Sequence, residues 1–275
     1  MFGVRLRSGI ILVILAIVLI MSGGPILCGG LLIISLIGMS ELYKIFKIKT
    51  QSLGIAGYIM AVLSYIYMYF RPDNSLGIVM IIMASMIVIL AVYVFTFPSY
   101  KTEQVLAAFF GVIYVALMLS YIYRMRTLDN GILVWLVFLS SWGCDTCAYC
   151  AGITFGRNGK HKMAPILSPK KSVEGGIGGV VGAILLGAIF GALLVDPAIL
   201  PDPAFSCAVV CGIGGLISMV GDLAASAIKR NYGVKDYGTL IPGHGGILDR
   251  FDSVIFTAPI IYYTIMLFMK GISIL

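Results

Sequence analysis

The sequence has few charged residues and few histidines. Only 11% of its 275 residues are charged, and it contains two histidines. A soluble domain has about 25% charged residues, so the composition excludes a soluble globular fold. It also excludes a disordered chain, a coiled coil and a basic nucleic-acid-binding domain, because each of these needs a charged surface. Apolar residues are abundant: 60% of the chain is hydrophobic and the mean hydropathy is +1.05, which is typical of an integral membrane protein.

Stretches without charge divide the chain into candidate membrane spans. A span needs about 20 apolar residues, and cutting the chain at charges, prolines and glycine pairs predicts about nine such helices. Their approximate ranges are 6–22, 25–43, 54–70, 76–97, 104–123, 131–155, 175–195, 204–228 and 251–270. We therefore predict an all-α, polytopic membrane protein.

Lysine and arginine indicate the orientation of these spans, because they concentrate in cytoplasmic loops. If the N-terminus is inside, 15 of the 19 basic residues fall in inner segments. The net charge of +7 is then a consequence of membrane topology, and no nucleic-acid partner is expected. The short N-terminus, which lacks a long polar extension, favours a bacterial inner membrane.

The two halves of the chain differ in where their charges lie. In residues 1–125 the charges lie at helix ends, which predicts a half concerned with packing and assembly. In residues 126–275 the charges enter the spans and two long inner loops appear, so we expect the catalytic half here. The cysteines at 144, 147 and 150 have the spacing of metal ligands, but they lie within a predicted helix and favour packing.

Carboxylates within membrane spans indicate function, because placing a charge there costs at least about 2.5 kcal/mol. Asp145 lies within the sixth predicted span and Asp222 near the inner end of the eighth. Further charges open two spans at the same inner boundary: Glu174, Asp249, Arg250 and Asp252. We expect these residues to meet in a cavity that opens to the cytoplasm. The alternative is a set of buried ion pairs that only join helices, such as Asp222 with Lys229 or Asp249 with Arg250.

The two inner loops indicate an anionic ligand. Lys170 and Lys171 come just before a predicted helix N-terminus, where backbone N–H groups and the helix dipole attract anions. The second loop, 229–250, combines lysines, aspartates and glycines that permit close backbone approach to a ligand. Loops that merely carry the topology-determining positive charge are the alternative. They explain the lysines but not the aspartates and glycines.

This combination suits phosphoryl or nucleotidyl transfer, in which a divalent metal and cations neutralise phosphate oxygens. Asp222 and Asp249 are candidates to bind hard cations through oxygen. No pair of nucleophile and base stands out. That absence fits an acceptor that is itself a phosphate, which is anionic at about pH 7 without a base.

A long motif in the C-terminal half resembles the phosphatidate cytidylyltransferase (CDP-diglyceride synthetase) family. Its matching residues are Ser226, Lys229, Arg230, Lys235, Asp236, Pro242, His244, Gly245, Gly246, Asp249, Arg250 and Asp252. The match extends upstream through Trp142, Asp145, Thr146, Ser168, Pro169, Lys170, Lys171, Ser172 and Glu174. The resemblance in motifs covers residues 141–253, and the N-terminal half agrees only in being helical and membrane-embedded.

The resemblance implies that CTP and phosphatidic acid are converted to CDP-diacylglycerol and pyrophosphate in phospholipid biosynthesis. It implies Mg²⁺ as cofactor, with a monovalent cation such as K⁺ as a further expectation, and a homodimer among membrane lipids. The implied metal ligands are Asp222 and Asp249. The implied catalytic residues are Asp145, Lys170, Lys171, Lys229, Arg230, Asp236, Arg250 and Asp252. The implied substrate-binding residues are Ser168, Ser172, Glu174, Ser226, Lys235, His244, Gly245 and Gly246.

Two other functions are compatible with the same composition. A CTP-dependent kinase of a polyprenol or similar membrane alcohol would share the helices and the basic loops, but it would transfer the γ-phosphate. An ion-coupled transporter would use Asp145 and Asp222 as intramembrane ion sites.

Overall fold

The structure is a computed structural model that describes residues 2–129, 131–156, 161–243 and 245–269, with side chains from Ser8 onward. Helices account for nearly all of its secondary structure, and they group into two compact units. The first unit is Met1–Thr127 with Val234–Phe251, and the second is Leu128–Gly233 with Asp252–Leu275. The segment Val234–Phe251, which lies within the C-terminal half of the sequence, therefore packs with the N-terminal helices.

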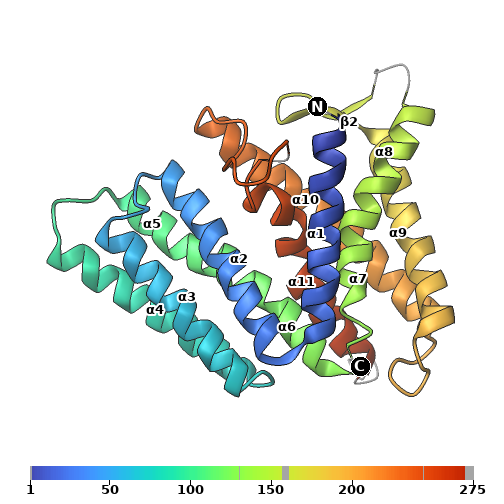
Figure 1. Cartoon of the computed structure of the whole chain (residues 1–275), viewed down its shortest axis with the longest axis horizontal. Helices are drawn as coiled ribbons and strands as arrows, with labels where there is room; N and C mark the ends of the chain where they lie inside the picture. The colour runs from blue at the N-terminus through green and yellow to red at the C-terminus, as the bar shows by residue number, and fades with distance from the viewer. Residues whose placement is uncertain (1, 130, 157–160, 244, 270–275) are drawn as a thin grey trace. The chain divides into compact units, whose positions relative to one another are not determined.

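The first unit consists of long apolar helices, seen in Figure 1 with α3 and α4 side by side. Its elements are α1 (Phe2–Ser22), α2 (Gly24–Ile45), α3 (Ser52–Phe70), α4 (Ser75–Phe95), α5 (Thr102–Gly111), η1 (Val112–Leu117) and α6 (Met118–Leu128). The last three form one continuous helical run in which η1 is a wider, π-helical stretch. The first turns of α11 (Leu248–Met269) also belong to this unit.

The second unit consists of long helical segments packed on one another, with a short hairpin that contacts α9. Its elements are α7 (Trp135–Phe138), the π-helical η2 (Leu139–Gly143), α8 (Cys144–Thr154), β1 (Lys162–Ala164), β2 (Ser168–Ser172), α9 (Val173–Leu194), α10 (Pro203–Asn231) and the remainder of α11. The strands pair antiparallel, with Lys162 opposite Ser172. The region expected to be an irregular inner loop therefore contains a small β-hairpin, which fixes where its lysines lie.

The prediction of an all-α, polytopic membrane protein is confirmed. Each of the nine expected spans falls on a helical segment. Within the part of the chain that the structure describes, seven helices are long and apolar enough to cross a membrane, and Ser8–Ser22 is a shorter apolar helix. The count of nine spans and the cytoplasmic position of the cavity stay predictions.

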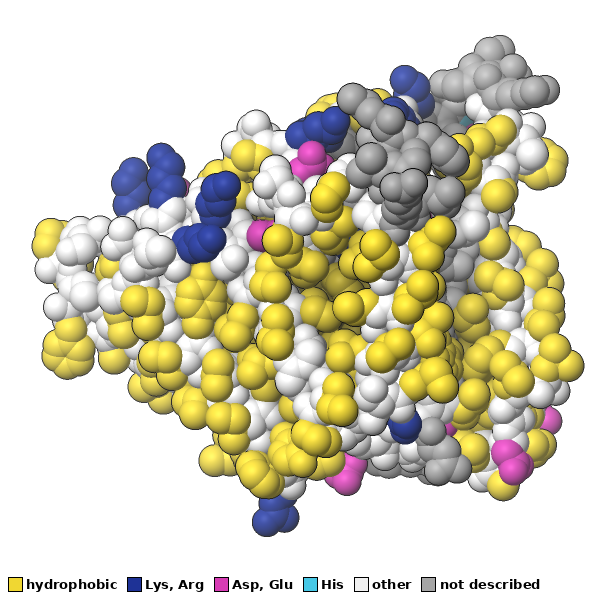
Figure 2. All heavy atoms as spheres, viewed as in Figure 1, with side chains coloured by type: hydrophobic (Ala, Val, Ile, Leu, Met, Phe, Trp, Pro, Cys, Tyr) yellow, Lys and Arg dark blue, Asp and Glu magenta, His cyan; other side chains and the backbone are white. Residues whose placement is uncertain are grey.

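Side-chain hydrogen bonds link the α2–α3 and α4–α5 connections at one end of the first unit. The Tyr100 hydroxyl lies 2.8 Å from the Ser52 hydroxyl, and the Gln104 amide donates to the Phe46 carbonyl at 3.2 Å. Figure 2 shows basic side chains gathered at one end of the α2–α5 region and apolar side chains along its middle. This distribution matches helices that cross a bilayer.

The fifth predicted span is longer than expected, because the helix continues to Leu128 instead of ending near residue 123. Arg124, which lies just beyond the predicted span 104–123, is 1% exposed, and its Nε donates to the Pro72 carbonyl at 2.7 Å. Arg126 donates to the Ile20 carbonyl at 3.0 Å. These arginines therefore join helices within the first unit, and their charges reflect packing as well as topology.

Glycines allow α9 to lie close against α8. A Cβ built on Gly178 would lie 2.2 Å from the Ala151 Cβ, and one on Gly182 would lie 2.4 Å from Cys147. Cys144 is also buried, and its Sγ lies 3.0 Å from the Cβ position of Gly179. Cys144 and Cys147 thus serve close helix packing as predicted, whereas Cys150 is exposed. The small-residue pattern of α9 is that of packed membrane helices.

We expect Gly178→Ala to destabilise the second unit by about 1 kcal/mol. Overpacking costs about 1–3 kcal/mol, and the better helix propensity of alanine offsets about 1 kcal/mol of it. The measurement is thermal unfolding in detergent. Gly29→Ala is the matched control, because an added Cβ at Gly29 meets no described atom within 4 Å. Equal melting temperatures for the two variants would contradict close α8–α9 packing.

Candidate active site

A cavity of about 560 Å³ in the second unit gathers several of the predicted site residues. It lies among α8, the hairpin, the start of α9 and α10. The predicted residues that line it are Asp145, Ser168, Lys170, Lys171, Ser172 and Asp222. Lys162 and Tyr149 also line it. Three lysines and two aspartates around one cavity can bind a polyanion together with a cation.

Lys171 and Asp222 form an ion pair across this cavity. Lys171 is near the end of β2, while Asp222 lies on α10, so the hairpin carries the lysine to the helix. Each side chain is 27% exposed, which leaves both within reach of a ligand. The ion pair predicted as an alternative for Asp222 had Lys229 as its partner. The structure gives Asp222 a different lysine, and that lysine is also a predicted catalytic residue.

Asp145 reaches the cavity from the start of α8. The π-helical stretch Leu139–Gly143 comes just before it, and such stretches change the phase of the helix that follows. Ser141 is buried, whereas Asp145 and Tyr149 are exposed and line the cavity. These three side chains, spaced four residues apart, therefore run from the protein interior to the cavity wall.

The N-terminus of α9 does not offer all of its N–H groups to a ligand. The Ser172 hydroxyl accepts the Gly175 N–H at 3.0 Å and so caps the helix, and the Val173 N–H donates to the His161 carbonyl at 2.9 Å. Glu174 pairs with His161, with 2.7 Å between Oε1 and Nδ1. An anion in this cavity would thus be bound mainly by the lysines. Ser172 has a structural role in addition to its predicted role in substrate binding.

Four of the predicted residues lie elsewhere in the second unit. Ser226 and Lys229 are buried on α10, Arg230 is exposed near its end, and Asp252 is buried on α11. The Asp252 Oδ1 accepts the backbone N–H of Ser253 at 2.8 Å. These four residues and Glu174 are not among the described residues that line the cavity of the second unit.

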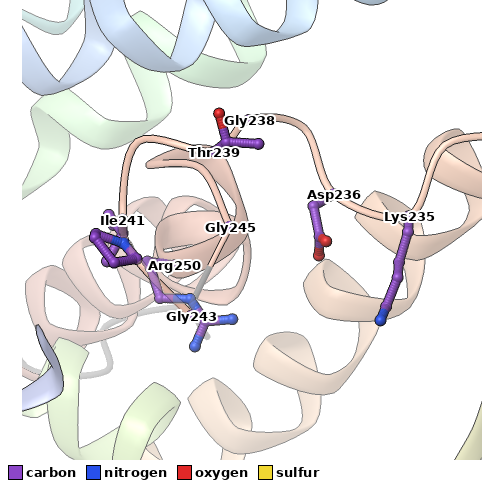
Figure 3. A pocket seen from close by; sticks show the side chains of 9 residues that line it. Lys235, Asp236, Gly238, Thr239, Ile241, Gly243, Gly245 and Arg250 are labelled. Carbon is purple, nitrogen blue, oxygen red and sulfur yellow. The ribbon is translucent and has the colours of Figure 1, made fainter. Parts of the chain in front are cut away.

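A second cavity, of about 570 Å³, lies in the first unit and is formed by the segment Val234–Phe251. The predicted residues Lys235, Asp236, Gly245 and Arg250 line it, together with Thr239. In Figure 3 the side chains of Lys235, Asp236 and Arg250 extend toward the same side of the loop. Two cations and one carboxylate at a glycine-containing loop suit a phosphate-bearing ligand. His244 lies outside the described residues.

Asp249 connects the two ends of this loop. Its Oδ2 accepts the backbone N–H of Tyr237 at 2.8 Å and that of Gly246 at 2.9 Å. Gly245 has φ +86°, and a Cβ there would lie 2.8 Å from the same oxygen. Glycine in this loop therefore leaves space for a carboxylate of the protein itself. The sequence analysis predicted instead that the glycines allow a ligand to approach the backbone.

Glu41 on α2 is a second carboxylate that organises the loop. It is 8% exposed, and it accepts the N–H groups of Ile247 and Leu248. Sequence reasoning missed it, because charges at helix ends in residues 1–125 were interpreted as belonging to a half concerned only with packing and assembly. The signal in the sequence was an acidic residue within the otherwise apolar stretch 31–43.

The carboxylates of the cavity in the second unit fit a magnesium ion that shares its ligands with a substrate. Among the described residues, no group of three or more His, Cys, Asp or Glu side chains could hold a metal ion. Mg²⁺ is commonly bound by one or two carboxylates, water and substrate phosphates. Asp145 and Asp222 supply such oxygens in one cavity. The assignment of Asp249 as a metal ligand stays a prediction.

The sequence matches a known family over almost the whole chain. The model of the Cytidylyltransferase family matches residues 3–268. This chain belongs to the cytidylyltransferase family. It is 33% identical over 238 residues to the phosphatidate cytidylyltransferase of Bacillus subtilis (strain 168), covering 84% of this chain and 86% of the relative. The proteins of the same name from Staphylococcus epidermidis (strain ATCC 12228) and Staphylococcus aureus (strain COL) are also 33% identical, over 94% of this chain and 96% of each relative.

We expect the paired lysines of this family member to carry anion binding in the second-unit cavity. Replacing Lys170 and Lys171 by glutamine should weaken the binding of inorganic pyrophosphate at least about tenfold, because each charge-assisted hydrogen bond contributes about 1.5–3 kcal/mol. Isothermal titration in detergent measures the affinity. Lys101→Gln, at an exposed lysine of the first unit, should bind like the wild type. An unchanged affinity in the double variant would contradict the anion site.

Proposed function

We propose that this chain is a phosphatidate cytidylyltransferase, which converts CTP and phosphatidate into CDP-diacylglycerol and pyrophosphate for phospholipid biosynthesis. The observation that carries the proposal is the 33% identity to curated enzymes of that name over 84–94% of the chain. The cavity lined by lysines and aspartates supports it, because the reaction handles several phosphate groups at once.

In the proposed reaction a phosphate oxygen of phosphatidate attacks the α-phosphorus of CTP. A new P–O bond joins the two phosphorus groups, the bond between the α-phosphorus and its bridging oxygen to the β-phosphate breaks, and pyrophosphate leaves with that electron pair. The phosphatidate oxygen is already anionic near pH 7, since the second pKa of a phosphate monoester is about 6. No general base is needed, which fits a site built from cations and carboxylates.

Two lysines of the second unit are proposed to neutralise phosphate charge in this reaction. Lys170 and Lys171 lie side by side on β2 in the cavity wall. Their positive charges would neutralise phosphate oxygens and help the leaving pyrophosphate, the main contribution that a protein makes to phosphoryl transfer. Asp222 holds Lys171 in place through their ion pair. Ser168 at the start of β2 is a neutral hydrogen-bonding group in the same wall.

The loop of the first unit supplies the second set of proposed ligand contacts. Lys235 and Arg250 would pair with phosphate oxygens of CTP, and Asp236 would orient one of these cations. Gly245, Gly246 and His244 are proposed to shape the nucleotide site. Lys229, Arg230, Ser226, Glu174 and Asp252 keep the roles that the resemblance implies, as part of the same proposal.

Mg²⁺ is the proposed cofactor, with Asp222 and Asp249 as its protein ligands and a monovalent cation such as K⁺ as an additional requirement. Bound Mg²⁺ would neutralise phosphate oxygens of CTP. Asp222 is the stronger candidate of the two, because it lines a cavity together with a second carboxylate, Asp145. Asp249 already accepts two backbone hydrogen bonds with Oδ2, so a metal would share this side chain with the loop.

The chain is a multi-pass membrane protein, as its apolar helices show. We propose that it lies in a bacterial inner membrane with the catalytic cavity facing the cytoplasm, where CTP is available. The relatives with bacterial sources support this location. A homodimer is part of the proposal. The polyprenol-type kinase and the ion-coupled transporter find no support in the family match or in the curated relatives.

We expect the purified protein to release pyrophosphate from CTP only when phosphatidate and Mg²⁺ are both present. The measurement uses CTP labelled in the α-phosphate and mixed micelles that contain phosphatidate, with and without a metal chelator. The label should enter the lipid product. A kinase would instead produce CDP and leave no label in the lipid, and a transporter would show no lipid-dependent release. Either result would refute the proposal.

We expect Asp222→Asn to reduce turnover at least about 100-fold, because the variant loses a charge that serves both the proposed metal and Lys171. Asp249→Asn should have a similar effect, with an added contribution from the weakened loop. Both variants and the wild type are assayed over a series of Mg²⁺ concentrations, together with their melting temperatures. Asp73→Asn, at an exposed turn, is the control. Substantial activity in both the Asp222 and Asp249 variants would refute the metal assignment.

A further inference from the structure

We infer that Glu41 is a positioning residue for the nucleotide-binding loop, the segment Val234–Phe251, an inference that rests on the proposed function. Glu41 lies on α2, about 200 positions before the loop in sequence, and within the same compact unit. The Oε1 atom accepts the Ile247 N–H at 3.0 Å, and Oε2 accepts the Leu248 N–H at 2.9 Å. One carboxylate thus binds two consecutive backbone groups.

The bonded groups are those that a helix leaves without an internal partner. Leu248 is the first residue of α11, and the first N–H groups of a helix have no carbonyl acceptor within it. A carboxylate at this end also interacts favourably with the helix dipole. Glu41 therefore caps α11 from a different helix. Arg250 lies only two residues further along the helix, so the cap also determines the position of the Arg250 backbone.

Two glycines of the motif are explained by the same carboxylate. A Cβ on Gly238 would lie 2.3 Å from the Glu41 Oε1, and one on Gly246 would lie 2.4 Å from Oε2. Neither glycine has a positive φ, so their backbone conformations are open to alanine. Space for Glu41 is what requires glycine at these two positions. The loop is shaped to receive this side chain from α2.

The cavity in this loop depends on the contact, because Gly238 and Arg250 both line it. Asp249 joins Tyr237 to Gly246, while Glu41 fixes the next two residues and contacts Gly238. Without the Glu41 carboxylate, the loop would keep its internal link but lose its attachment to α2. Lys235 and Arg250 would then occupy a wider range of positions, and CTP would bind less tightly.

The test compares Glu41→Gln with Glu103→Gln, a matched change at an exposed glutamate of α5. Glutamine keeps one acceptor, but its NH₂ group faces a backbone donor. We expect the KM for CTP to rise about tenfold, the effect of losing one charge-assisted hydrogen bond. The KM for phosphatidate should stay within about twofold of the wild-type value, because the loop is proposed to contact CTP. A general loss of folded protein would lower the apparent kcat and leave both KM values unchanged.

Hydrogen exchange gives a readout that does not depend on activity. Amides of residues 234–251 should exchange faster in Glu41→Gln than in the wild type, while α3 and α4 exchange as before. Gly238→Ala tests the contact from the loop side and should give the same exchange pattern. If Glu41 is first replaced by alanine, adding Gly238→Ala should cause little further change, because the clash is gone.

The outcomes separate the two proposals. A wild-type protein that makes no CDP-diacylglycerol would refute the proposed function, whereas the exchange experiment would still report on Glu41. Wild-type exchange in residues 234–251 for both Glu41→Gln and Gly238→Ala would overturn the inference. So would an unchanged KM for CTP in an active Glu41→Gln enzyme, or equal rises in the KM for both substrates.

Discussion

Two buried carboxylates that accept backbone N–H groups hold the segment Val234–Phe251 in place. Burying a carboxylate is costly unless hydrogen bonds replace those of water, and here each carboxylate receives two. Asp249 connects Tyr237 with Gly246, and Glu41 receives Ile247 and Leu248. The loop that forms the cavity of the first unit, the start of α11 and the position of Arg250 all depend on these four bonds. The glycine-containing part of this segment, which precedes α11, thereby gains a defined conformation without a regular strand or helix.

The second unit reaches its arrangement by close helix packing. Glycines on α9 bring it against α8, and the hairpin then returns the chain to the start of α9. As a result Lys171 on β2 meets Asp222 on α10. In an apolar surrounding a paired charge is far less costly than an isolated one. The same pair is therefore suited both to stabilising the unit and to receiving a phosphate or a metal ion.

Part of the candidate site could be read from the sequence because membrane spans make charges conspicuous. Asp145 and Asp222 stood out within apolar helices, and Lys170 and Lys171 stood out before a helix N-terminus, and all four line one cavity. Glu41 escaped notice because helix-end charges are common in membrane proteins and carry no information about their partners. Its bonding to residues about 200 positions later depends on tertiary packing, which local pattern cannot indicate. The hairpin was missed because three residues of β1 are too few for a periodic signal.

Patterns along the chain were enough to predict the class of protein, the approximate helix ranges and the family. Apolar runs of about 20 residues require membrane-spanning helices, because backbone groups in lipid must bond within their own segment. The motif of residues 226–252 was specific enough to indicate the chemistry. Tertiary structure alone decided which charges face one another, that Lys171 is the partner of Asp222, and that a glutamate on α2 holds the loop. These pairings depend on helix separations set by glycines. The distance between two helices depends on how both pack together, so the sequence of one helix cannot predict it.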